Sequence, residues 1–187
     1  MFKLFKKIGS FFLDLTETVV IALAIFVLVY LFLFQPHQVR GNSMYPNFHD
    51  GDYLLTDKIS YRLHEPKRGD VVVFRAPKNE EYDYIKRIIG LPGERIKIER
   101  GKVFINDQIL EEPYLPKDYV TTTGRLWQTK KEGILLPEGH YFVLGDNRGH
   151  SSDSRQWGPV PEKNIIGKAW LRYWPIDRWG LIEPVMP

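Results

Sequence analysis

Three polar stretches of the chain carry residues of the types that perform nucleophilic chemistry. The first reads GNSMYP, in which Ser43 stands between Gly41 and Pro46. A serine in such a stretch usually serves the backbone, because Gly, Asn, Ser and Pro dominate turns for conformational reasons. A catalytic serine also needs a base that takes its proton and donors that hold an oxyanion. Ser43 is therefore a candidate nucleophile only if the rest of the chain supplies these groups.

The candidate base is Lys86, which lies in the run Tyr84-Ile85-Lys86-Arg87-Ile88-Ile89. On a strand, Lys86 shares a face with Tyr84 and Ile88, and Arg87 lies on the opposite face, so one of the two cations points among apolar neighbours. A lysine that snorkels or protects an edge strand also explains this pattern. The functional alternative is a desolvated lysine whose pKa falls from about 10.4 to near 7.5, at a cost of about 4 kcal/mol. Arginine cannot take this role because it keeps its proton.

The third stretch, GDNRGHSSDSR, covers residues 145–155. Asp, Asn, Gly and Ser at this density are typical of a loop whose side chains bond to its own backbone. A hydroxyl in such a loop can orient a neutral lysine. Asp153 can pair with Arg148 or Arg155 and stiffen the loop.

Other kinds of site find little support in the sequence. The Gly-x-Ser-x-Gly elbow is broken by Tyr45, and His-Glu-x-x-His and the phosphate-binding Gly-x-x-x-x-Gly-Lys-Ser/Thr loop are missing. Cysteine is absent, and the five histidines show no paired spacing, so we expect no metal and no cofactor. The net charge of +3 comes without a concentrated basic stripe, which disfavours nucleic acid as a partner.

Residues 11–34 form an apolar run that could anchor the chain in a membrane. The candidate residues all follow this run in the sequence. About 24 residues of helix span about 36 Å, which is enough to cross the hydrocarbon core. Residues 1–10 carry Lys3, Lys6 and Lys7 and no acid, so we expect this tail in the cytoplasm and residues 35–187 on the outer side. A cleavable signal peptide is disfavoured because residues 35–38 offer no small-x-small site. We therefore expect a single-pass protein of the plasma membrane.

The part after the anchor reads as short strands separated by turns. Strands are predicted over residues 53–56, 71–74, 84–89, 95–99, 103–105, 109–110 and 141–144. Single helical turns are expected around Tyr61 and at residues 161–165, and residues 111–136 are predicted to be the least regular part. The fold class is thus mainly β behind one transmembrane helix.

Taken together, the three stretches resemble the bacterial type I signal peptidases, membrane-anchored Ser–Lys proteases that remove signal peptides. GNSMYPNF resembles the box that carries the nucleophile, and GDYLLTDK resembles the second box. RGDVVVFRAP followed by YIKRIIGLPGE resembles the box of the lysine base, and EGHYFVLGDNRGHSSDSRQWGPVP resembles the fourth. The four boxes follow in order behind an anchor, over nearly the whole chain.

The resemblance implies a domain of coiled antiparallel β-sheets, shared with repressor-type proteases, with Ser43 as nucleophile and Lys86 as general base. It implies that Ser151 orients the lysine, that Asp153 and Arg155 form the ion pair of the loop, and that Gly41 permits close approach to the oxyanion. In the fourth box, Gly149 and His150 stand where the family commonly has Asp-Asn.

The implied partners are the signal peptides of secretory preproteins, the lipid bilayer and, as a candidate, the secretion translocon. We expect the substrate to bind as an extended strand, with contacts to Val39, Met44, Tyr84 and Ile85. Two other functions remain open. A self-cleaving repressor-type protease would need a DNA-binding domain that is not readable here. An anchored β-domain that binds peptides without cutting them would have no need for Ser43 and Lys86.

Overall fold

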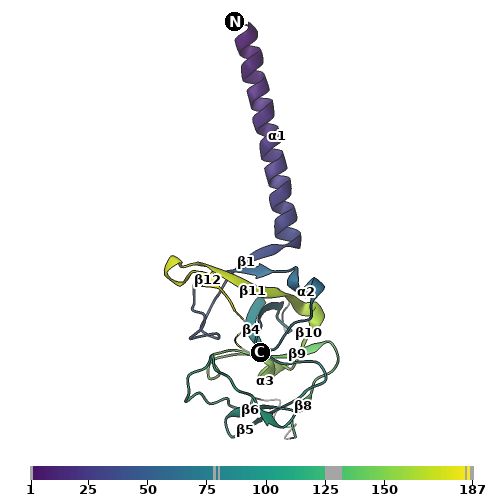
Figure 1. The fold of residues 1–187 in the computed structure, drawn as a ribbon, viewed down its shortest axis with the longest axis vertical. Coiled ribbons are helices and arrows are strands. Elements are labelled where there is room, and N and C mark those ends of the chain that lie inside the picture. Colours follow the sequence, from purple (N-terminus) through teal and green to yellow (C-terminus); the bar gives the residue numbers. More distant parts are fainter. Residues whose placement is uncertain (1, 78, 80, 125–131, 184, 186–187) are drawn as a thin grey trace.

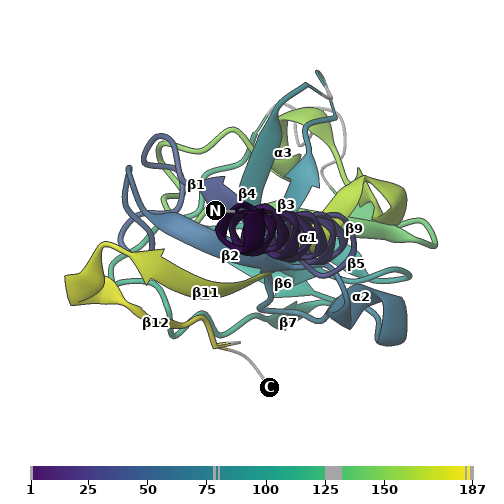
Figure 2. The ribbon, with the colours of Figure 1, turned by 90° about the horizontal axis from the view of Figure 1, so that it is seen from above.

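The computed structural model describes residues 2–77, 79, 81–124, 132–183 and 185, and for residues 2–6, 8 and 10 it describes the backbone alone. The chain begins with one long helix, α1 (Phe2–Phe32), and continues into a β-rich domain (Figure 1). Within α1, the segment Phe11–Phe32 has a mean hydropathy of 2.4 and no part of it is buried against the rest of the chain. Its length and composition fit a membrane anchor. Seen from above, α1 stands over the middle of the domain (Figure 2).

The larger of two antiparallel sheets carries the candidate chemistry. Its strands, in spatial order, are β1 (Phe34–Gln38), β2 (Tyr53–Asp57), β11 (Ile165–Trp174), β3 (Val71–Arg75), β4 (Asp83–Gly90), β9 (His140–Leu144) and β10 (Val160–Pro161), and β12 (Gly180–Leu181) pairs with β11. β1 is an edge strand and contains Pro36, which has no N–H to give to a second neighbour. β1 joins α1 to the sheet directly, so the anchor leads straight into the segment before Ser43.

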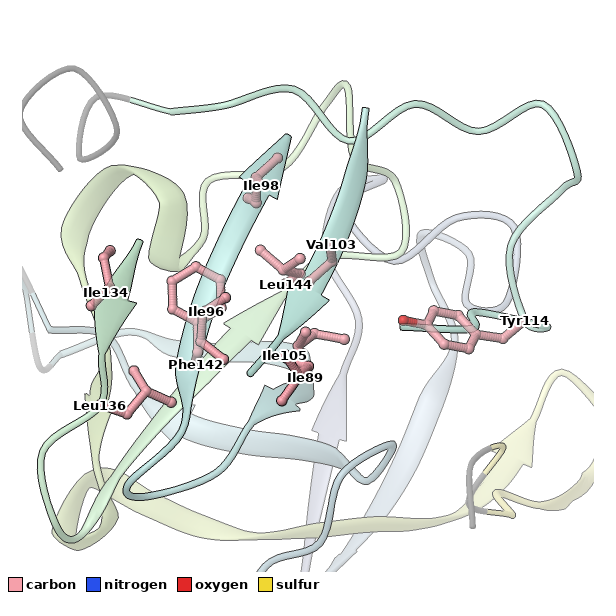
Figure 3. Close-up of a cluster of buried hydrophobic side chains, with 10 residues drawn as sticks. All are labelled: Ile89, Ile96, Ile98, Val103, Ile105, Tyr114, Ile134, Leu136, Phe142 and Leu144. Atoms are coloured by element: carbon pink, nitrogen blue, oxygen red, sulfur yellow. The ribbon is translucent and has the colours of Figure 1, made fainter. Parts of the chain in front are cut away.

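The smaller sheet covers the end of the domain that lies away from α1 (Figure 1). Its strand order is β7 (Gln108–Ile109), β6 (Lys102–Ile105), β5 (Arg95–Glu99) and β8 (Ile134–Leu135). Alternating side chains of this sheet pack with residues of β4 and β9 in a cluster of buried apolar side chains (Figure 3). This cluster fixes β4 from one side, because Ile89 is one of its fully buried members. Burial of each such side chain contributes about 1.5–3 kcal/mol to folding.

Helical structure outside α1 is limited to single turns among the described residues. These turns are α2 (Ser60–Leu63), α3 (Ser154–Trp157), η2 (Glu162–Asn164) and η3 (Ile176–Arg178). α2 and η2 lie where turns were expected, whereas α3 and η3 were not predicted. Asp153 caps α3 by accepting a hydrogen bond from the Arg155 N–H at 3.2 Å.

The predicted fold class is confirmed, and the predicted strands match β2 to β7 and β9. The prediction missed β1, β8, β10, β12 and the longest strand, β11. β8 lies in the stretch 111–136 that was expected to be the least regular, and residues 125–131 of that stretch lie outside the described residues. α1 ends at Phe32, and Phe34 already belongs to β1, so regular sheet begins one residue before the predicted boundary at 35.

Candidate active site

Ser43 lies on the turn that follows β1. Gly41 adopts a φ of +83°, a conformation that glycine takes without steric cost, and its N–H donates to Asp50 Oδ1 at 2.6 Å. Met44 next to the serine is fully buried and holds the turn to the core. Ser43 itself stays half-exposed. Within the described part of the chain, the Ser43 N–H donates no hydrogen bond and is free to meet a ligand.

Lys86 reaches the serine from the middle of β4. Its Nζ lies 2.7 Å from Ser43 Oγ and donates to the carbonyl oxygen of Ile85, also at 2.7 Å. The lysine is only 4% exposed, and this burial lowers the pKa of its ammonium group to about 8, although the charges of Asp153 and Asp146 oppose the shift. A lysine with this pKa is substantially neutral at mildly alkaline pH, so it can accept a proton from the hydroxyl.

Arg87, on the opposite face of β4, is buried as deeply as Lys86. One buried cation was expected in this run, and the structure has two. The Arg87 guanidinium is bound at two points to Asp146, with Nε–Oδ1 at 2.9 Å and Nη2–Oδ2 at 2.7 Å. It also lies over the ring of Tyr114, 4.2 Å from the centroid. Arg87 therefore keeps a charge partner, whereas no ion pair is formed by Lys86 among the described residues.

The loop 145–155 contacts the turn that carries Ser43, because the Asn147 N–H donates to the Ser43 carbonyl oxygen. Asp153 pairs with Arg155, with Oδ2 and Nη2 2.8 Å apart, while Arg148 pairs with Glu112. Arg155 Nη2 also donates to the Arg148 carbonyl oxygen at 2.7 Å, which ties the two ends of the loop together. The loop is thus stiffened by buried ion pairs. The side chain of His150 is exposed.

Ser151 lies close to the nucleophile turn but has no bond to Lys86. A Cβ added to Gly145 would come within 2.2 Å of Ser151 Oγ and 2.4 Å of the Ser43 carbonyl oxygen, so the glycine allows these groups to approach each other. The Ser151 hydroxyl is buried and has no hydrogen-bond partner within the described chain. An unpaired buried hydroxyl costs about 1–3 kcal/mol, which suits a group that acts during a reaction.

Asn147 is a site residue that the sequence reasoning missed. Its backbone N–H donates to the Ser43 carbonyl oxygen at 3.0 Å, and its Nδ2 donates to the Asn42 carbonyl oxygen at 2.9 Å. The Tyr119 hydroxyl donates to Asn147 Oδ1 at 3.0 Å and fixes the orientation of the amide. Asn147 therefore fastens the nucleophile turn to the loop. An asparagine in a turn, two residues from a glycine on either side, gives no sequence signal for such a long-range contact.

A groove of about 360 Å³ opens beside the Ser43–Lys86 pair. Residues 37–40 line one wall and residues 82–86 the other, and Val39, Tyr84 and Ile85 are among them. Met44 does not line the groove. It packs beneath it in a buried cluster with Val39 and Leu54. His37 Nε2 and Asp83 Oδ2, 3.3 Å apart, connect the two walls away from the nucleophile. Among the described residues no group of three or more His, Cys, Asp or Glu could hold a metal ion.

Comparison with known proteins places the chain in a family. The family model described as "Signal peptidase, peptidase S26" matches residues 12–174. The chain belongs to this peptidase family. It is 37% identical over 175 residues to the probable signal peptidase I-2 of Synechocystis sp., covering 91% of this chain and 77% of that protein. It is 35% identical to signal peptidase IB of Staphylococcus aureus, covering 87% and 89%.

A crystal structure of a signal peptidase I from Enterococcus faecalis is also similar. It is 35% identical and has a TM-score of 0.48, over 56% of this chain and 97% of that one. Family membership makes this chain a peptidase, and the N-terminal apolar helix fits a membrane-anchored enzyme.

Proposed function

We propose that this enzyme cleaves signal peptides from secretory preproteins with a Ser43–Lys86 dyad. The observation that carries the proposal is the 2.7 Å contact between Lys86 Nζ and Ser43 Oγ, made by a lysine that burial has brought to a pKa of about 8. The relatives named signal peptidase supply the substrate class.

In the proposed mechanism, neutral Lys86 accepts the Ser43 proton while Oγ attacks the carbonyl carbon of the scissile bond. The oxyanion that forms is held by backbone N–H groups, chiefly that of Ser43, with Gly41 leaving room for the peptide. The Lys86 ammonium then gives its proton to the leaving amine, which leaves an acyl group on Ser43. In the second step neutral Lys86 takes a proton from water, the water oxygen attacks the acyl carbon, and the proton returns to Ser43 Oγ. The bond from Lys86 to the Ile85 carbonyl fixes the amine during both steps.

Ser151 is proposed to orient Lys86. A neutral amine has two N–H groups, and one of them is satisfied by the Ile85 carbonyl. The hydroxyl of Ser151 is buried, unpaired within the described chain and close to the nucleophile turn, so it is suited to accept the other. Asp153 and Arg155 support this role indirectly, since their ion pair holds the loop that carries Ser151.

The substrate is proposed to lie in the groove as an extended strand between residues 37–40 and residues 82–86. Val39 and Ile85 would form shallow pockets for small side chains next to the cut. Tyr84 would contact the peptide from the same wall as Lys86. Met44 would act from beneath by supporting Val39.

The substrate class is tested with detergent-solubilised full-length protein and a secretory precursor. We expect one cut after a small-x-small sequence, read as a new N-terminus by mass spectrometry. Replacing the small residue before the cut with Phe should slow cleavage at least about a hundredfold, because the shallow pocket cannot take the ring. If the precursor stays intact while the protein still binds it, the non-catalytic peptide-binding alternative is correct.

We propose that residues 11–34 anchor the enzyme across the plasma membrane, with residues 1–10 inside and residues 35–187 outside. Phe34, just after the apolar helix, stacks on Trp170 with ring centroids 5.2 Å apart. Further exposed aromatic and apolar side chains follow from the end of β11 to β12: Tyr173, Trp174, Ile176, Trp179 and Leu181. Such side chains favour the bilayer interface. The translocon is proposed as a partner only because it delivers the same substrates.

The orientation predicts which side of a sealed cell is open to protease. A protease added outside spheroplasts should degrade the β domain and spare only the segment before Phe34, because the basic N-terminus stays inside. Immunoblots with tags at the two ends measure this. Protection of the C-terminal tag in sealed cells, with digestion after lysis, would reverse the orientation.

A further inference from the structure

A second pocket, of about 270 Å³, lies on the side of the domain that faces the anchor and is separate from the Ser43–Lys86 pair. Its polar lining residues are Gln35, Lys58, Arg75, Asp83, Lys163 and Asn164. They come from β1, the residue after β2, the end of β3, the start of β4 and η2. Asn164 Nδ2 donates to the Arg75 carbonyl oxygen at 3.3 Å and so joins two of these segments.

The pocket gathers positive charge that its own walls do not neutralise. Lys58, Arg75 and Lys163 face a single carboxylate, that of Asp83, and Asp83 already contacts His37 Nε2. Lys58 Nζ has only a neutral partner, Gln35 Oε1 at 3.3 Å. In the described part of the chain none of the three cations forms an ion pair. Three cations that converge on a concave surface favour an anion with several acceptor oxygens.

The position of the pocket along the anchor axis indicates which anion is available. The Lys58 N–H donates to the Leu33 carbonyl oxygen at 2.9 Å, and Leu33 directly follows the apolar segment Phe11–Phe32. The Arg62 guanidinium on α2 lies 5.8 Å from the ring centroid of Phe32, at the same level. The headgroup layer extends about 5–8 Å beyond the hydrocarbon on each side of a bilayer. The anions concentrated in that layer are lipid phosphates.

We propose that Lys58, Arg75 and Lys163 form a binding site for the phosphate group of an anionic phospholipid. The proposal goes beyond proteolysis and rests only on α1 crossing the bilayer. A lipid held here would fix the rotation of the domain about its anchor. It would thereby fix the direction in which the peptide groove meets a substrate that leaves the same membrane.

The test measures lipid binding to the full chain in neutral detergent by native mass spectrometry. The probes are short-chain phosphatidylglycerol, short-chain phosphatidylcholine and inorganic phosphate. The triple variant Lys58→Gln, Arg75→Gln, Lys163→Gln removes the three cations of the pocket. The matched control Arg95→Gln, Lys102→Gln, Lys117→Gln removes the same charges from exposed positions away from the anchor.

We expect phosphatidylglycerol to bind at least about tenfold more tightly than phosphatidylcholine, and the pocket variant to lose this preference. The Kd of the control variant for phosphatidylglycerol should stay within about twofold of that of the unmodified chain. Equal losses in both variants would show attraction by net charge alone and would overturn the site. Competition by inorganic phosphate at the same concentration would overturn the lipid assignment, because the site would then take a soluble anion.

Two further measurements separate this proposal from folding defects and from the proteolytic function. Lys163→Gln alone changes an exposed side chain and should weaken phosphatidylglycerol binding about threefold, so an unchanged Kd counts against the site. Ser43→Ala should bind the lipid as the unmodified chain does. Lipid binding with no proteolysis, or proteolysis with no lipid preference, therefore identifies which proposal has failed.

Discussion

The Ser43→Ala variant is expected to lose precursor cleavage by at least about four orders of magnitude. Ser43 is half-exposed and lines the groove, and its Oγ lies 2.7 Å from the buried amine of Lys86. The change removes one hydrogen bond, worth about 1 kcal/mol, so the domain should keep its fold and its melting temperature within a few degrees. The rate is measured by densitometry of precursor and mature bands.

A matched control for this variant is Ser60→Ala. The Ser60 hydroxyl donates to Asp57 Oδ2 outside the groove, so its removal also costs one hydrogen bond but should leave cleavage unchanged. Cleavage by purified Ser43→Ala at a rate comparable to that of the Ser60 variant would show that Ser43 is not the nucleophile.

The Lys86→Met variant is expected to lose activity by several orders of magnitude while the protein stays folded. Methionine has nearly the shape of the lysine chain and suits a buried position, so the loss would report the missing base and not a cavity. Without a base, the Ser43 hydroxyl keeps its proton at neutral pH. Lys86→Arg should also be inactive, because a guanidinium cannot give up its proton. The readout is kcat/KM on a soluble precursor peptide.

His150 supplies the control for this prediction, because a serine–histidine mechanism would need it. Its side chain is exposed, and among the described residues the hydrogen-bond partner of Ser43 Oγ is Lys86. We expect His150→Ala to change kcat/KM by less than about tenfold, or under about 1.4 kcal/mol of transition-state stabilisation. An inactive His150→Ala together with an active Lys86→Met would refute the Ser–Lys mechanism.

Ser43 and Lys86 could be singled out as candidates because each carries a local signal and because the four boxes follow the order seen in type I signal peptidases. Ser43 stands in a turn with Gly41 and Pro46, and Lys86 interrupts an apolar strand. The distance between them could not be predicted, because it depends on how the turn after β1 folds back over β4. Asn147 could not be predicted for the same reason. It positions the Ser43 turn through two hydrogen bonds to residues more than a hundred positions earlier in the chain.

The parts of the fold that escaped prediction have identifiable physical causes. β1 contains Pro36, which normally argues against a strand and is tolerated here because β1 is an edge strand. β11 mixes charged and aromatic side chains around Gly167. That glycine is needed because a Cβ would come within 2.2 Å of the Asp57 carbonyl oxygen on β2. Met44 was expected to contact the substrate. Its side chain is fully buried in the cluster beneath the groove, a position that its place next to Ser43 in the sequence does not reveal.

The pH dependence of kcat/KM on a precursor peptide tests the proposed role of Lys86 most directly. Burial lowers the pKa of Lys86 to about 8, and only the neutral amine can take the Ser43 proton. The logarithm of kcat/KM should therefore rise with pH with unit slope below about 8 and level off above it. A profile that levels off near the imidazole value of about 6.5, or that stays flat from pH 6 to 9, would contradict a lysine base.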